Sequence, residues 1–87
     1  MQVNKIENVK RIPLAIDYRR MYRADAEIAF GITAVSSCPI EFVLELSPYG
    51  TQQVSVSFLG PTDYPIIPAI NLLREHIVDL DRKGSLP

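Results

Sequence analysis

Residues 40–59, IEFVLELSPYGTQQVSVSFL, decide the fold of this chain. Apolar and polar residues alternate on both sides of the centre of this stretch, which is the period-two pattern of half-buried β-strands. Between the two runs lies Pro48-Tyr49-Gly50, where proline fixes φ and glycine is free to adopt a positive φ, as a turn requires. The stretch therefore predicts an antiparallel hairpin with one apolar and one polar face.

The residues before this hairpin predict another strand. Residues 24–35, ADAEIAFGITAV, again alternate with period two, and we interpret Gly31 within them as a bulge or a close approach of another backbone. Residues 36–39, SSCP, then form the connection to the hairpin. The apolar face of this predicted strand consists of Ala24, Ala26, Ile28, Phe30, Ile32 and Ala34.

A single helical pattern follows the break at residues 60–63, GPTD. Apolar residues then recur every three or four positions, which is the spacing of an amphipathic helix. Pro65 or Pro68 fits its first turn, where a missing N–H costs little, and Gly84 is its expected stop. The predicted apolar stripe consists of Ile66, Ile70, Leu73, Ile77 and Leu80.

The first 23 residues are ambiguous. The alternation over residues 12–18 favours a strand that Pro13 restricts to a sheet edge, whereas residues 17–23 are also compatible with a short helix that begins at Asp17. With the other elements they predict an α+β fold: an antiparallel sheet of three to four strands packed on one C-terminal helix. The chain is interpreted as one domain, 1–87, with residues 1–11 a candidate for a poorly ordered arm and residues 85–87 for a tail.

Composition excludes several classes of protein. Cys38 is the one cysteine and His76 the one histidine, so neither an internal disulfide nor a structural zinc site can form, and we expect no metal and no cofactor. No apolar run approaches the roughly 20 residues of a membrane span, and the N-terminus lacks the pattern of a signal peptide. The lone thiol is compatible with the reducing cytoplasm, where we expect the protein.

The charges are unevenly distributed. Residues 1–23 hold six basic and two acidic residues, a net charge of +4, whereas residues 24–87 hold three basic and eight acidic residues, a net charge of −5. Separated charge of this kind favours either an anion site at one end or association between copies.

The best candidate site lies in the basic part. It consists of Tyr18, Arg19, Arg20, Tyr22 and Arg23. Guanidinium groups match the geometry of phosphate, and aromatic rings stack on bases, so this segment is a candidate for phosphate, nucleotide or nucleic-acid binding. The alternative is that the arginines pair with Asp25, Glu27 or the acidic C-terminal half.

This segment resembles part of a known signature. Arg19-x-x-x-Arg23, followed by residues 45–50, ELSPYG, resembles the two motifs of PilZ domains. The resemblance implies a β-barrel that binds a cyclic dinucleotide, with Arg19 and Arg23 on its phosphates and Ser47 and Gly50 at the base pocket. Glu45 stands where that family has Asp or Asn, and few residues follow for the remaining strands.

No catalytic constellation is recognisable, and we expect a protein that is not an enzyme. A dyad of Cys38 and His76 is possible in space, but a structural thiol and a partly exposed helix histidine are the expected alternatives. The carboxylates Asp25, Glu27, Glu41 and Glu45 fall on the polar strand face, where solvated side chains are required in any case.

These observations favour a small non-catalytic binding module, self-associating or bound to a larger protein partner, in an accessory or regulatory role. One helix covers one sheet face, so we expect an exposed apolar patch on the remaining surface. Open strand edges offer a second route to pairing. The apolar residues outside the regular patterns are Val43, Leu59, Ile66, Ile67, Leu72 and Val78.

Overall fold

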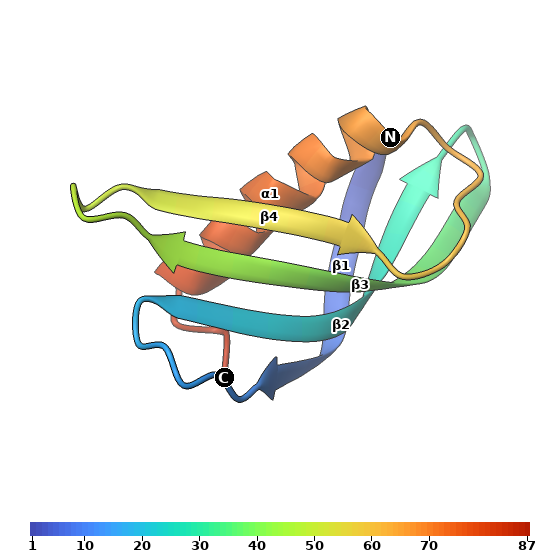
Figure 1. The fold of residues 1–87 in the computed structure, drawn as a ribbon. Coiled ribbons are helices and arrows are strands. Elements are labelled where there is room, and N and C mark those ends of the chain that lie inside the picture. The colour runs from blue at the N-terminus through green and yellow to red at the C-terminus, as the bar shows by residue number, and fades with distance from the viewer.

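The computed structural model describes residues 1–87 and confirms the predicted α+β class. Strands β1 (Gln2–Ile12), β2 (Arg19–Phe30), β3 (Ala34–Leu46) and β4 (Gln52–Phe58) form one antiparallel sheet in the order β1-β2-β3-β4, and helix α1 (Ile66–Arg82) lies across one face of it (Figure 1). The molecule is elongated, with extents of 42 × 23 × 22 Å. No helix in it has the length and hydropathy to span a membrane.

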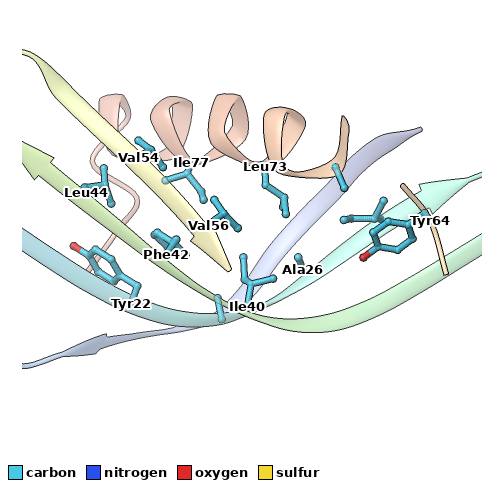
Figure 2. Close-up of a cluster of buried hydrophobic side chains, with 13 residues drawn as sticks. Tyr22, Ala26, Ile40, Phe42, Leu44, Val54, Val56, Tyr64, Leu73 and Ile77 are labelled. Carbon is cyan, nitrogen blue, oxygen red and sulfur yellow. The ribbon is translucent and has the colours of Figure 1, made fainter. Parts of the chain in front are cut away.

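The inner face of the sheet, which α1 covers, holds the core. Side chains alternate between the two faces of a strand, and the even-numbered positions of β2, β3 and β4 point inward. Leu73 and Ile77 of α1 are fully buried against them (Figure 2). The buried cluster consists of Tyr22, Ala24, Ala26, Ile28, Ile40, Phe42, Leu44, Val54, Val56, Tyr64, Ala69, Leu73 and Ile77. The predicted hairpin over residues 40–59 is thereby confirmed as part of β3 and β4.

The helical stripe is centred slightly differently from the prediction. Ala69, Leu73 and Ile77 are its buried positions, whereas Ile66 is half exposed at the first turn. Pro68 occupies that first turn, and Gly84 adopts a φ of 70° just after the last turn, as predicted.

The strand predicted over residues 24–35 is wrong at its end. The chain reverses at residues 31–33, where Gly31 has a φ of 70°, so Gly31 makes the β2–β3 turn and is not a bulge. Residues 36–39 are therefore part of β3, paired with β2, and not a connection. Pro39 is tolerated there because β4 ends at Phe58, and its carbonyl still accepts a bond from the Leu59 N–H at 2.9 Å.

The N-terminal residues also differ from the prediction. Residues 2–12 form β1 along β2, whereas residues 13–18, expected mostly as strand, form the loop between them, and no helix occurs over residues 17–23. Two register irregularities, after Val3 and after Glu7, place Val3, Ile6 and Val9 against the core at intervals of three residues. The period-two search failed because the bulges lengthen the repeat.

The C-terminal residues are fixed to the sheet. Leu86 packs against the core, and the Tyr22 hydroxyl donates to the Pro87 carbonyl at 3.0 Å. Arg20 Nη2 lies 3.0 Å from Asp81 Oδ1, and Gln52 donates to the other oxygen of that carboxylate at 3.1 Å. Burial alone lowers the pKa of Arg20, but the Asp81 carboxylate and the Tyr22 oxygen outweigh burial and raise it. The predicted tail is thus an ordered extension of the packing.

Two isoleucines of α1 test how the helix is held. Ile77 is fully buried and Ile67 is 73% exposed. Ile77→Ala should lower the free energy of unfolding by about 2–5 kcal/mol, because it leaves a cavity under the helix. The same truncation at Ile67 should change it by less than about 0.5 kcal/mol. Urea denaturation followed by circular dichroism measures both; equal losses would contradict this packing.

Candidate functional site

The three arginines of the candidate segment do not form one patch. Arg19 and Arg23 point to the outer face, where Arg19 Nε lies 3.7 Å from Glu45 and Arg23 Nε lies 3.2 Å from Glu41. Arg20 points to the inner face, toward Asp81. Alternation along β2 separates them, and each is paired with a carboxylate. The partners are not the predicted Asp25 and Glu27, although Asp81 belongs to the acidic C-terminal half.

The two tyrosines are separated as well. Tyr22 is 0% exposed and stacks on Phe42 with ring centroids 5.0 Å apart, so it is a core residue that cannot stack on a base (Figure 2). Tyr18 precedes β2 and is 58% exposed, and its carbonyl accepts from the Leu46 N–H at 2.9 Å. The idea of a continuous basic and aromatic surface is therefore wrong.

The residues that resemble the PilZ motifs serve the β3–β4 turn. Ser47 Oγ accepts the backbone N–H groups of Tyr49 and Thr51 at 3.3 and 3.1 Å, and Gly50 has a φ of 81°. This is the hydrogen bonding of a closed turn. The fold is an open four-stranded sheet with a helix, not the β-barrel that the resemblance implies.

Cys38 and His76 are not joined. The Cys38 thiol is buried and directs its weak bond to the Pro39 carbonyl at 3.5 Å, while His76 makes no side-chain hydrogen bond and is partly exposed on α1. Near the thiol, the buried Tyr64 hydroxyl has no hydrogen-bond partner. Burial raises the pKa of Tyr64, and Cys38 and Asp63 raise it further.

The four carboxylates of the outer face are engaged individually. Asn4 donates to Glu27 at 3.1 Å and Asn8 to Asp25 at 2.9 Å, in addition to the two arginine pairs. No three metal-ligating side chains come together anywhere in the chain. These carboxylates fit the solvated strand face that the sequence also allowed.

The outer face carries no large apolar patch, contrary to the expectation. Its apolar side chains are few: Val43, which is 91% covered, lies between the paired Met21 and Ser55, and Ile12 pairs with Met21. Leu72 and Val78 are partly covered on α1, so of the six residues proposed for the patch, Leu59, Ile66 and Ile67 are exposed. Charged and polar residues occupy most of the remaining positions.

Exposed apolar side chains gather instead at the two ends of the molecule. One end, formed by the β1–β2 loop and the β3–β4 turn, presents Leu14, Ile16, Tyr18, Leu46 and Tyr49. The other end, formed by the N-terminus, the β2–β3 turn and the start of α1, presents Met1, Ile32, Val35, Leu59, Ile66 and Ile67. Figure 1 shows these loops at opposite ends of the sheet.

A groove runs between β4 and α1, and sequence reasoning did not identify it. Its volume is about 680 Å³, and Gln52 and Val54 form its strand side. Its helix side carries two basic and two acidic residues, Arg74, Arg82, Glu75 and Asp79. The available signal was the position of β4 as the last strand of a meander, which leaves it at an edge.

This geometry defines a small α+β protein with an open strand edge and two apolar ends. The chain belongs to the BB_0187 family, whose model matches residues 1–82. No curated protein and no solved structure matches it.

An ion pair on the groove wall can be tested by titration. Lys83 Nζ lies 2.8 Å from Asp79 Oδ2, and its hydrogen bond lowers the pKa of Asp79 below 3.8. Lys83→Met should therefore raise the pKa of Asp79, as measured by NMR of the carboxyl carbon, whereas Lys83→Arg should leave it lowered. Because the folded pKa is the lower one, the pair stabilises the fold above pH 3.8 and this contribution is lost as pH falls through the folded pKa. An Asp79 pKa that is the same in both variants would contradict this assignment.

Proposed function

We propose that this protein is a non-catalytic binding module that self-associates and serves as an accessory or regulatory subunit of a larger protein partner. The observation that carries the proposal is the surplus of exposed apolar side chains: eleven large ones are at least 40% exposed in a chain of 87 residues. Grouped apolar side chains of this kind mark protein contacts, because their burial on association is favourable.

The grouping of these side chains supports protein binding more than their number does. Tyr49 is 94% and Ile32 101% exposed, and each lies in a tight turn with apolar neighbours around it. Single exposed apolar residues are common on any protein, whereas clusters at the ends of a short sheet are not required by the fold. We further propose the cytoplasm as its location, which the buried, unpaired Cys38 thiol supports.

Binding of phosphate, a cyclic dinucleotide or nucleic acid is the alternative hypothesis, and the geometry favours it less. An anion that reached Arg19 or Arg23 would have to displace Glu45 or Glu41. Such exchange replaces one charge-assisted contact by another and leaves a carboxylate next to the ligand, which opposes anion binding.

Self-association is tested by mass measurement. Light scattering coupled to size exclusion should give at least twice the 9.8 kDa chain mass at high micromolar concentration, and the mass should fall on dilution. The chain mass found throughout that range would contradict the proposal.

A further inference from the structure

We propose that two copies of this chain pair through β4, edge to edge and antiparallel, so that their sheets join about a two-fold axis at Ser55. The inference rests on the proposed self-association and names the surface through which it occurs. It is argued from the free edge of β4, from the absence of charge along it and from the groove beside it.

The backbone of β4 presents unpaired groups to solvent. Ser47 donates to the Thr51 carbonyl and Leu59 donates to the Pro39 carbonyl, so odd-numbered residues of this strand bond to β3. In an antiparallel pair these positions alternate, and the N–H and C=O groups of even-numbered residues therefore point away from β3. No strand lies on that side. The outward-pointing groups belong to Gln52, Val54, Val56 and Phe58.

The two edges of the sheet differ in how they are protected. β1 carries Lys5, Glu7, Lys10 and Arg11 together with two register irregularities, which are common devices against pairing. β4, QQVSVSF, contains no charge and no proline, and its register with β3 is continuous. An unprotected edge beside a protected one favours β4 as the pairing strand.

The strand bounds determine the register. A two-fold axis at Ser55 places Gln52 opposite Phe58 of the second copy and Val54 opposite Val56, which uses the whole of Gln52–Phe58. In this register the outward-pointing residues of one strand face those of the other and can exchange both backbone bonds. Ser55 then faces its own copy in a non-hydrogen-bonded pair, where side chains are closest.

The surroundings of β4 leave room for a second strand and match its charge. Two hollows, of about 680 and 370 Å³, follow the strand and share Val54 and Arg74, and Figure 1 shows α1 running alongside β4. The helix side of the larger hollow has no net charge, because Arg74 and Arg82 balance Glu75 and Asp79. A two-fold copy of this wall meets both signs of charge and no net repulsion, whereas a strongly charged partner segment would gain little here.

Charge reversal at the axis tests the pairing. Ser55 is exposed, so Ser55→Lys should leave the fold intact but place two ammonium groups opposite each other, weakening the dimer at least roughly tenfold. Ser55→Glu should weaken it similarly, and an equimolar mixture of the two variants should restore association. Analytical ultracentrifugation measures the dissociation constants, and urea midpoints check the fold.

Ser57→Lys is the matched control, since Ser57 is exposed on the same face and faces Gln53 of the second copy in this register. It should change the dissociation constant by no more than about twofold. A wild-type dimer that Ser55→Lys leaves unchanged, or that both lysine variants weaken equally, would overturn pairing about Ser55 and leave self-association standing. A monomeric wild type that binds an extended peptide at β4 instead would overturn both this inference and the proposed self-association.

Discussion

The burial of one helical stripe against one face of the sheet is the interaction on which the rest of this structure depends. Leu73 and Ile77 are fully buried over inner-face residues such as Phe42 and Leu44. Each apolar side chain removed from water in this way contributes on the order of 1.5–3 kcal/mol, which is large compared with the net stability of a domain this small. The Arg20–Asp81 pair and the Tyr22 hydroxyl bond act at the border of this contact and fix where α1 ends.

That contact also determines which surfaces remain available. Because α1 covers the inner face, the outer face must be stable in water, and its arginines and carboxylates pair across neighbouring strands. Apolar residues that fit neither face are left in the turns and at the helix start, which explains why they collect at the two ends. The edge of β4 is open for the same topological reason: a meander has two edges, and the helix covers a face and not an edge.

Regular patterns were predicted correctly and irregular ones were not. The hairpin over residues 40–59 and the helix follow strict periods of two and of three to four, so their faces could be assigned from sequence. β1 was missed because its bulges give Val3, Ile6 and Val9 a spacing that fits neither period. Gly31 was misinterpreted because a glycine inside an alternating run is compatible with both a bulge and a turn, and the pairing of β2 with β3 decides between them.

The sequence by itself determined the fold class, the hairpin, the helix and the identity of most core residues, because these follow from local periodicity and turn chemistry. It also determined that no disulfide or cysteine-rich zinc site can exist, since the ligands are lacking. Only the tertiary structure decided that Tyr22 is buried, that Arg19, Arg20 and Arg23 are divided between two faces, and that β4 borders a groove. Strand register and sheet order bring residues distant in the chain together, and no local pattern encodes which carboxylate an arginine will meet or which edge stays open.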